Sequence, residues 1–329
     1  MTEGPGGQRS TETTTPGPFQ RALVLTAGLG TRLRPLTLAR AKAAVPVDGE
    51  PLASRVICWL AQAGVNDLVL NLHHKPQTIT RAIGDGSSLG VRVRYSWESP
   101  VLGSAGGPRH ALPLLIDGLD PAPPLLLVNG DTLTDVDLAD LAEHHSRTGA
   151  LVTMALIPNP RPDKYGGVVL DANDAVTGFT RRGSGVESFH FIGVQAAAPG
   201  VFASLADGVF AESVLGIYPA MMASAPGSIR GFVSSASFHD IGTPADLLAT
   251  SLDLAAADGR QNSPRHGDRV RIDPSARVER SLLWDDVTIE PGSSLRECIV
   301  ADGVTIAAGE RFASKAIVME DGRRLIEAI

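Results

Sequence analysis

Residues 22–47, ALVLTAGLGTRLRPLTLARAKAAVPV, form the stretch on which the interpretation of the chain depends. The stretch begins with an apolar, β-type run at Ala22–Thr26 and continues as Ala27-Gly28-Leu29-Gly30-Thr31-Arg32. Two glycines around one residue allow a tight turn and let backbone N–H groups approach a ligand closely. Arg32 and Lys42 add fixed positive charge. This pattern suits a polyphosphate, although an ordinary strand-to-helix turn explains the glycine pair about equally well.

The turn matches neither of two common phosphate-binding motifs. The chain has no GxxxxGK[ST] loop, and Leu33 stands where the third glycine of GxGxxG would be. The complete string Gly-x-Gly-Thr-Arg-Leu-Arg-Pro-Leu-Thr is more specific than either motif, so its meaning depends on what the rest of the chain contains.

Length and composition exclude several classes of protein. A chain of 329 residues favours two domains with a sizeable core. The net charge of −7 argues against a nucleic-acid partner. Cys58 and Cys298 give no disulfide framework, which indicates a reduced, cytoplasmic location. No apolar run approaches the ~18 residues that cross a bilayer, so no membrane association is expected. Residues 1–19 lack a signal-peptide core, and we expect them to be a disordered tail.

Strands and helices alternate through the first half of the chain. This alternation predicts an α/β fold with a mostly parallel sheet that helices cover on both faces, and ligands bind beyond the carboxyl ends of the strands in such sheets. The expected strands are 67–72, 91–96, 125–129 and 151–157, and the expected helices are 51–64, 77–83 and 137–147. A further helix is expected from Pro244 to Ala257, with Thr243 as its N-cap.

Three segments carry further candidate site residues. Small residues from Gly103 to Gly107 would let a flat base approach the backbone, but a flexible loop is locally the more common explanation. Asp131 follows the expected strand 125–129 and stands where a metal ligand would, although Asn-Gly-Asp also favours a plain turn. Asp240 precedes the Thr243 cap, and capping does not explain it.

Shorter strands are expected after Lys164, at 165–170, 176–180 and 187–194. We expect this part to enclose a second substrate. Arg181 and Arg182 follow the middle strand, where basic pairs are usually solvated surface. Gly193 lets the backbone pass close to a ligand or to a neighbouring strand.

The C-terminal sequence repeats every 17 residues. Ile272, Ile289 and Ile306 begin three copies in which apolar residues recur about every six positions, without the 3.6-residue rhythm of a helix. Such a repeat predicts a short parallel β-helix. The expected organisation is therefore a tail at 1–19, a first domain at 20–257, a linker at 258–268 and the β-helix at 269–329.

Together, these motifs resemble the sugar-1-phosphate nucleotidyltransferases over residues 21–256. Residues 98–115 and 191–199 look most like the N-acetylmuramate-1-phosphate uridylyltransferases, and the repeat resembles the left-handed β-helix of mannose-1-phosphate guanylyltransferases and glucose-1-phosphate adenylyltransferases. The resemblance implies a Rossmann-like nucleotidyltransferase fold and the reaction of a nucleoside triphosphate with a sugar 1-phosphate to give an NDP-sugar and pyrophosphate.

The resemblance also implies roles for individual residues. Arg32, Lys42, Asp131 and Asp240 would be catalytic, and both aspartates would bind Mg²⁺. The nucleotide would be bound by Ala27, Gly28, Gly30, Thr31, Arg32, Gly103, Ser104 and Gly106. The sugar phosphate would be bound by Gly166, Arg182 and Gly193. The β-helix would be a structural module that could form a homo-oligomer.

Two departures from the family pattern stand out. Ala41 and Ala43 replace the prolines that commonly flank the lysine, so the sequence predicts a less rigid Lys42. Arg181-Arg182-Gly183 replaces the usual Glu-Lys-Pro, which removes a carboxylate for sugar hydroxyls, while Arg182 can take the place of the lysine as a phosphate contact. The base and sugar stay open among guanosine with mannose, uridine with N-acetylmuramate, and thymidine or adenosine with glucose. A regulatory homologue that binds an NDP-sugar is the non-enzymatic alternative.

Overall fold

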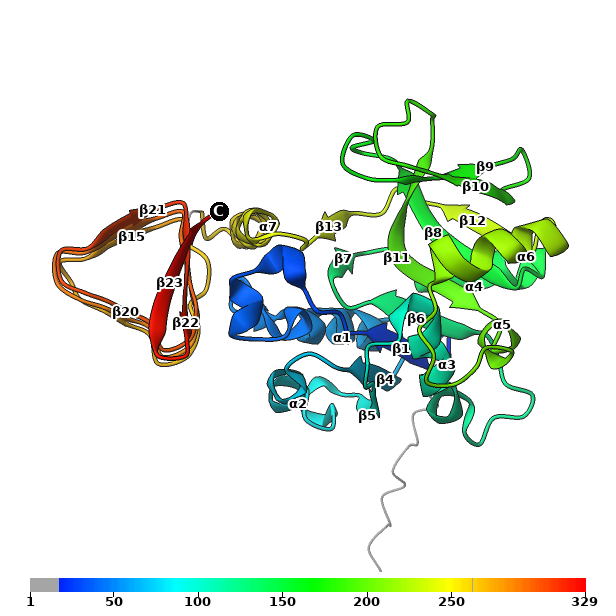
Figure 1. Ribbon diagram of the computed structural model, residues 1–329, viewed down its shortest axis with the longest axis horizontal. Coiled ribbons are helices and arrows are strands. Elements are labelled where there is room, and N and C mark those ends of the chain that lie inside the picture. Colours follow the sequence, from blue (N-terminus) through cyan, green and yellow to red (C-terminus); the bar gives the residue numbers. More distant parts are fainter. Residues whose placement is uncertain (1–17, 262) are drawn as a thin grey trace, which may run out of the picture.

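A nine-stranded sheet runs through the larger part of the computed structural model, which describes residues 18–261 and 263–329 (Figure 1). The order is β10-β9-β11-β6-β1-β4-β5, and β8 and β12 extend the sheet beside β11. β1 is parallel to β4 and β6, and β4 to β5, whereas β11 is antiparallel to its neighbours. The strands are β1 (Ala22–Leu25), β4 (Asp67–Leu72), β5 (Arg92–Trp97), β6 (Leu125–Asn129), β8 (Val152–Pro158), β9 (Gly167–Leu170), β10 (Val176–Thr180), β11 (Phe189–Ala197) and β12 (Ile229–Val233).

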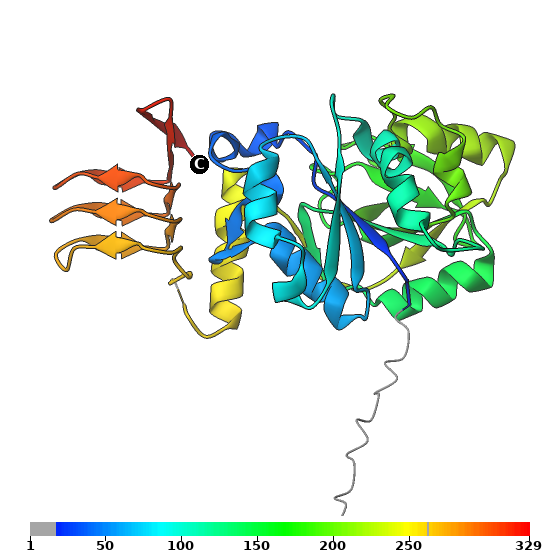
Figure 2. The same cartoon turned by 90° about the horizontal axis from the view of Figure 1, so that it is seen from below.

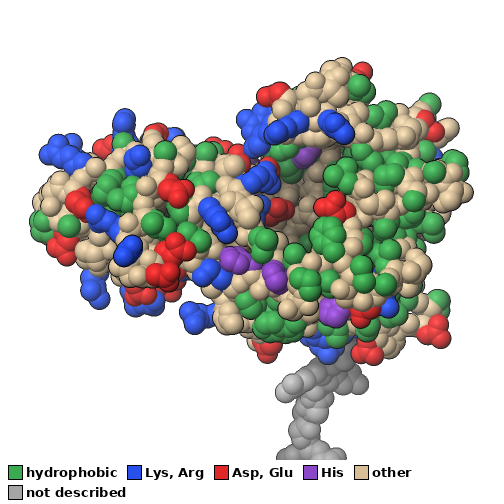
Figure 3. All heavy atoms as spheres, in the orientation of Figure 1, with side chains coloured by type: hydrophobic (Ala, Val, Ile, Leu, Met, Phe, Trp, Pro, Cys, Tyr) green, Lys and Arg blue, Asp and Glu red, His purple; other side chains and the backbone are tan. Residues whose placement is uncertain are grey.

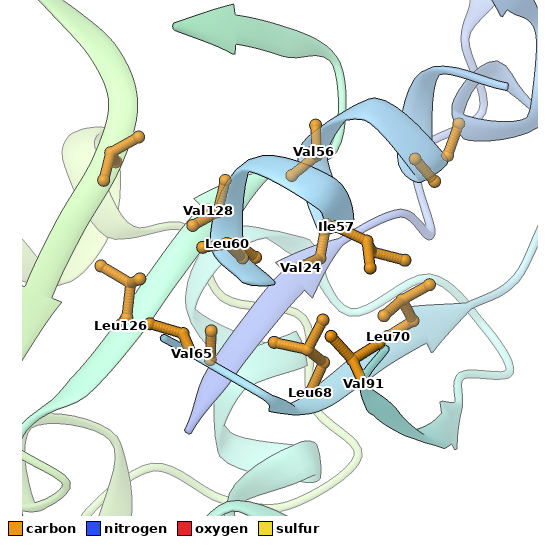
Figure 4. Close-up of a cluster of buried hydrophobic side chains, with 14 of the residues drawn as sticks. Val24, Val56, Ile57, Leu60, Val65, Leu68, Leu70, Val91, Leu126 and Val128 are labelled. Atoms are coloured by element: carbon orange, nitrogen blue, oxygen red, sulfur yellow. The ribbon is translucent and has the colours of Figure 1, made fainter. Parts of the chain in front are cut away.

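Helices cover both faces of this sheet, which explains why the central parallel strands β1, β4 and β6 are apolar almost throughout, whereas the edge strand β5 is not. Val24 packs on the side of α1, α2 and α4, whereas the adjacent Leu23 packs on the side of α3, α5 and α6, because successive strand residues point to opposite faces. Figure 4 shows the α1 residues Val56, Ile57 and Leu60 over β1, β4 and β6. The helices are α1 (Leu52–Gln62), α2 (Pro76–Ile83), α3 (Gly103–Ile116), α4 (Leu138–Thr148), α5 (Gly200–Ala203), α6 (Tyr218–Ser224) and α7 (Pro244–Ala257).

Short elements surround the carboxyl ends of the parallel strands. The glycine turn after β1 leads through three 3₁₀ helices into a small hairpin, and a second strand pair joins two distant parts of the chain. These elements are η1 (Thr31–Leu33), η2 (Leu36–Leu38), η3 (Lys42–Ala44), β2 (Pro46–Val47), β3 (Glu50–Pro51), β7 (Thr132–Thr134) and β13 (Phe238–Asp240). Two further single turns are the 3₁₀ helix η4 (Ser87–Leu89) and the π-helix η5 (Ser213–Ile217).

Two expectations need correction. Residues 103–107 are not a loop, because they form the first turns of α3. The expected tail at residues 1–19 lies outside the described residues as far as residue 17, but Phe19 is buried against the sheet, so the folded part begins before residue 20. No helix among the described residues is long and apolar enough to cross a membrane.

The 17-residue repeat forms three faces of short parallel strands, which Figure 2 shows as stacked coils. Ile272, Ile289 and Ile306 align in register on one face. This arrangement confirms the predicted β-helix and is consistent with the left-handed form. The strands are β14 (Arg271–Ile272), β15 (Arg277–Glu279), β16 (Leu282–Leu283), β17 (Thr288–Ile289), β18 (Ser294–Arg296), β19 (Ile299–Val300), β20 (Thr305–Ile306), β21 (Arg311–Ala313), β22 (Lys315–Glu320) and β23 (Arg323–Ala328). β23 folds back antiparallel to β22 and covers the end of one face.

An apolar cluster joins the β-helix to the larger part of the chain. Leu33 and Val45, which flank the predicted catalytic segments, pack in one cluster with α7 and with β-helix residues that include Trp284 and Ile299. In Figure 2, α7 stands between the stacked coils and the sheet. The two parts therefore share a buried core.

Candidate active site

A cavity of about 250 Å³ lies where β1 and β6 end. Of the predicted residues, Ala27, Gly28, Lys42, Gly103, Ser104 and Asp131 line it. Gly28 has open space where a side chain would stand, so a ligand can approach its backbone. Gly30 instead serves the turn itself: its φ is +61°, and a Cβ there would lie 2.7 Å from Thr37 Cγ2. Thr31 and Arg32 are exposed beyond the turn.

A buried amide and carboxylate hold the rim of this cavity. Asn71 Oδ1 accepts hydrogen bonds from the N–H groups of Thr26 at 2.6 Å and Ala27 at 3.3 Å, and Asn71 Nδ2 donates to Glu98 Oε1 at 2.7 Å. Glu98 is 5% exposed, and its other oxygen accepts from the N–H of Leu102 at 2.8 Å. One polar pair therefore fixes both the glycine turn and the start of α3. Neither residue is assigned a role from the sequence. Asn71 is a polar residue near the end of an apolar strand, and Glu98 is the first residue of the stretch 98–115 that carries part of the family resemblance.

The β7–β13 pair brings the backbone segments of the two predicted metal ligands side by side. Asp240 lies opposite Thr132 in this pair, and the N–H of Ile241 donates to the main-chain oxygen of Asp131 at 3.2 Å. Lys42 Nζ lies 2.8 Å from Asp131 Oδ2. The structure thus brings Lys42 and both aspartates to one edge of the sheet.

Two further cations border Asp240. A Cβ on Gly242 would lie 3.1 Å from both Arg32 Nη1 and Asp240 Oδ2, so the guanidinium and the carboxylate flank the same glycine. Lys164 Nζ lies 3.8 Å from Asp240 Oδ2 and 2.9 Å from Asp246 Oδ1. The site therefore gathers three cations around two candidate metal ligands, and sequence reasoning did not single out Lys164.

The donor set fits a divalent cation of the hard class. Among residues 18–261 and 263–329, no group of three or more His, Cys, Asp and Glu side chains could hold a metal ion, so the protein would supply two carboxylates. Mg²⁺ is often held in this way, by one or two carboxylates together with phosphate oxygens of the substrate. The side chains of Asp131 and Asp240 are 34% and 13% exposed, which leaves them accessible to a bound phosphate.

A second cavity, of about 750 Å³, adjoins the first. Ser104 lines both cavities. The predicted sugar-phosphate residues Gly166 and Arg182 line the second cavity together with Arg181 and Glu212. Figure 3 shows the surface hollowed beside the part of the chain that carries β9 and β10, with charged side chains at its edge.

His190 forms part of the wall of the second cavity. Its ring packs at a tilt of 36° against Tyr165, at a centroid distance of 4.3 Å, and edge-to-face against Phe238, at 4.6 Å. Burial lowers the pKa of His190 more than the hydrogen bond with the Gly166 backbone raises it. The imidazole is therefore neutral at pH 7 and provides a flat, weakly polar surface.

The small residues of α3 have a structural reason. Ala105 and Gly106 donate their N–H groups to the main-chain oxygen of Ala211, at 2.9 and 3.1 Å. A Cβ added to Gly103 would lie 2.6 Å from the same Ala211 oxygen. A Cβ added to Gly106 would lie 2.5 Å from the main-chain oxygen of Val209. Close packing of this neighbouring segment thus requires glycine at both positions, and only Gly103 of the two also lines the first cavity.

Position 193 is also glycine for a structural reason. Its φ is +79°, and a Cβ there would lie 2.8 Å from Asn129 Cβ, so the glycine lets β11 pass close to the end of β6. Gly193 lines neither cavity, but Asn129 lines the first. The predicted role of Gly193 at the sugar phosphate stays a prediction.

Comparison with known proteins identifies the family. The profile of a family described as nucleotidyl transferase matches residues 21–256. The chain belongs to this family. It is 30% identical over 292 residues to a mannose-1-phosphate guanylyltransferase of Mycobacterium tuberculosis, an alignment that covers 81% of this chain and 80% of the relative. It is also 36% identical over 209 residues to an N-acetylmuramate alpha-1-phosphate uridylyltransferase of Neisseria meningitidis, covering 61% of this chain and 83% of the relative.

Solved structures support the fold of this nucleotidyl transferase. HddC from Yersinia pseudotuberculosis aligns with a TM-score of 0.63 at 22% identity and covers 72% of this chain and 100% of its own. A second structure of HddC, in complex with GMP-PN, gives a TM-score of 0.61 at 21% identity. The predicted family and fold class are therefore confirmed.

Proposed function

We propose that this nucleotidyl transferase joins a nucleoside triphosphate to a sugar 1-phosphate and releases pyrophosphate. The observation that carries the proposal is that Lys42 pairs with Asp131 at the wall of the first cavity, while Asp240, whose strand pairs with the residues after Asp131, lies beside Arg32. A second cavity adjoins the first. The first cavity borders the glycine turn and suits the nucleotide. The second contains an arginine pair and suits a phosphorylated sugar.

The reaction needs little covalent chemistry from the protein. A sugar phosphate is already a nucleophile, so its oxygen attacks the α-phosphorus in line while the α–β bond breaks and pyrophosphate leaves. The main obstacle is repulsion between two anions, and the protein overcomes it by positioning and by fixed charge. Lys42 neutralises charge at the α-phosphate, and Arg32 holds the departing pyrophosphate.

Mg²⁺ is the cation that we assign to Asp131 and Asp240. When bound, it supplies positive charge to phosphate oxygens without proton transfer. Lys42 keeps the Asp131 carboxylate in place, and Lys164 does the same for Asp240, at 2.8 and 3.8 Å. The two lysines also limit the net negative charge that an incoming triphosphate meets.

Arg182 and Gly166 are the proposed contacts of the sugar phosphate. Arginine can grip a phosphate with two parallel hydrogen bonds, which gives direction as well as charge. Among the described residues, the Arg182 side chain has neither a hydrogen bond nor an ion pair, so it is free for this role. Glu212, at the wall of the same cavity, is available to accept hydrogen bonds from sugar hydroxyls.

Our first choice of substrates is GTP with mannose 1-phosphate. It rests on the relative that aligns with 81% of this chain, compared with 61% for the uridylyltransferase. The alternatives are UTP with N-acetylmuramate 1-phosphate, which the second relative favours, and a glucose 1-phosphate with another nucleotide. A non-catalytic protein that binds an NDP-sugar is the remaining alternative, and the retention of both cations and both carboxylates argues against it.

A matrix of nucleoside triphosphates against sugar 1-phosphates, measured by pyrophosphate release, tests the proposal. We expect release with one preferred pair, and loss of release when EDTA replaces Mg²⁺. Absence of release with every pair, together with tight NDP-sugar binding, would instead favour the regulatory alternative. We further propose that the enzyme acts in the cytoplasm, where its free thiols Cys58 and Cys298 stay reduced, and that the β-helix contributes to a homo-oligomer.

A further inference from the structure

The β-helix contacts the segment that carries Lys42. Arg40 precedes Lys42 by two residues, and its guanidinium reaches across to the β-helix. Its Nε and Nη2 donate to the two oxygens of Asp302 at 2.8 and 2.6 Å, and Nη2 also donates to Asp285 Oδ2 at 2.6 Å. The Arg40 side chain is 15% exposed and lies over the ring of Trp284, 5.4 Å from its centroid. This is a two-pronged, partly desolvated contact rather than a solvated surface pair.

The chain between Arg40 and Lys42 leaves little freedom. Ala41 is fully buried, and its N–H donates to Thr78 Oγ1 at 3.0 Å. The next turn, η3, closes with the N–H of Ala44 donating to the main-chain oxygen of Ala41 at 2.8 Å. Displacement of Arg40 is therefore transmitted to Lys42 through a single buried residue.

Apolar packing links the same two modules around the other catalytic residues. Leu33 follows Arg32, Ile241 follows Asp240, and both are fully buried in the cluster that contains Trp284 and Ile299 of the β-helix. The β-helix thus lies directly behind three of the four residues to which we assign catalysis. Because Ala41 and Ala43 give the Lys42 segment none of the rigidity of proline, this external contact supplies it.

We propose that Arg40 is a positioning residue through which the β-helix holds Lys42 at the α-phosphate, so that the C-terminal repeat is part of the catalytic apparatus. This inference rests on the proposed function. The geometry that catalysis demands is narrow, since misplacement of a reacting group by about 1 Å can cost about 100-fold in rate.

The test compares Arg40→Lys and Asp302→Asn with the control Asp286→Asn. Lysine keeps the charge of Arg40 but loses the fork that holds two carboxylates. Asp286 lies in the same β-helix and pairs with Arg269 at 2.6 Å, so its substitution has the same chemistry without the contact to Arg40. We measure kcat and KM for both substrates, and the melting temperature, at a temperature at which each variant is fully folded.

We expect Arg40→Lys and Asp302→Asn each to lower kcat by about 10- to 100-fold. KM for the sugar 1-phosphate should stay within about twofold of the wild-type value. Asp286→Asn should have the kcat and KM of the wild type. The double variant Arg40→Lys/Asp302→Asn should lose no more than the worse single variant, because both break one contact. Three results would overturn this inference while leaving the proposed function intact. They are a wild-type kcat in both single variants, an equal loss of kcat in Asp286→Asn, and a loss of kcat that matches the unfolded fraction of the variant. A wild-type protein that releases no pyrophosphate with any substrate pair would overturn the proposed function as well.

Discussion

Lys42 Nζ lies 2.8 Å from Asp131 Oδ2, across a sequence separation of 89 residues. The Lys42 side chain is 12% exposed, so water does not fully screen this pair. The contact fixes the lysine where the first cavity meets the candidate metal ligands. It also means that a triphosphate enters a site whose charges are already arranged, which reduces the reorganisation that the reaction requires.

Asp131→Asn and Asp240→Asn should each nearly abolish turnover. Removal of one preorganised charge contact of this kind costs ~3–4 kcal/mol in the transition state, which corresponds to roughly a 100- to 1,000-fold loss of kcat. Folding should change little, because a partly exposed ion pair contributes only about 0–1 kcal/mol. Pyrophosphate release at saturating Mg²⁺ and thermal unfolding give the two readouts. Ordinary turnover in either variant would refute the metal assignment.

Gly107→Ala should weaken both folding and nucleotide binding. A Cβ at this buried position would lie 2.7 Å from Glu98 Oε1 and 2.9 Å from Asn71 Nδ2, so it would displace the pair that holds the glycine turn. We expect a loss of about 1–3 kcal/mol in the free energy of unfolding and a raised KM for the nucleoside triphosphate. Gly200→Ala is the matched control, because that helical glycine has no neighbour within 4 Å and alanine there should be neutral or slightly stabilising. Equal effects in the two variants would contradict this account.

Arg182→Ala should impair binding of the sugar 1-phosphate selectively. Loss of a charge-assisted contact of about 1.5–3 kcal/mol predicts a roughly 10- to 100-fold higher KM for the sugar 1-phosphate, with KM for the nucleotide unchanged. Arg182→Lys should recover part of the loss, because it keeps the charge but not the paired hydrogen bonds. Arg311→Ala, at an exposed site on β21, controls for loss of surface charge. An unchanged KM in Arg182→Ala would place the sugar phosphate elsewhere.

Local patterns were sufficient to predict much of the fold. Thr243 as N-cap, with Pro244 at the first helical position, predicted α7 at Pro244–Ala257, where the structure has it. The 17-residue spacing of Ile272, Ile289 and Ile306 predicted the β-helix, because each copy repeats the same inward contact. Signals of this kind depend on neighbours in the sequence, so no knowledge of the tertiary structure is needed to recognise them.

The supports of the site could not be recognised in this way. Asn71 and Glu98 acquire their role only when β1, β4 and the start of α3 come together. Asn71 belongs to no motif, and the resemblance of residues 98–115 to a family gave Glu98 no role. Gly103 and Gly106 suggested room for a base, yet their smallness is required by the Val209–Ala211 segment, which lies about a hundred residues further along the chain. Small residues in a sequence indicate that another group packs closely against the backbone there. They do not indicate whether that group is a ligand or another part of the chain.

The stability of the junction between the two modules should depend on pH through Asp48, which is 1% exposed. Burial raises the pKa of its carboxyl. Hydrogen bonds from the Arg260 guanidinium and the N–H of Arg265 together lower this pKa by more than burial raises it, so the pKa lies below its usual value. A depressed folded-state pKa contributes stability that is present above the unfolded value of about 3.9 and is lost as pH falls through the folded value. The wild type should therefore lose this contribution only in acid.

Asp48→Asn isolates that contribution. At pH 7 we expect the variant to be less stable by about 2 kcal/mol, because Arg260 loses a charged partner at 2.6 Å but stays partly hydrated. The difference from the wild type should shrink as the pH falls below about 4, because the unfolded wild type then binds a proton that the folded state does not, and it should vanish once the pH is below the folded-state pKa of Asp48. Urea unfolding of the wild type and of Asp48→Asn at several pH values measures this difference in the free energy of unfolding. Asp258→Asn removes a more exposed partner of the same arginine and should cost at most about 1 kcal/mol. A difference that stays constant with pH would show that Asp48 acts through shape rather than charge.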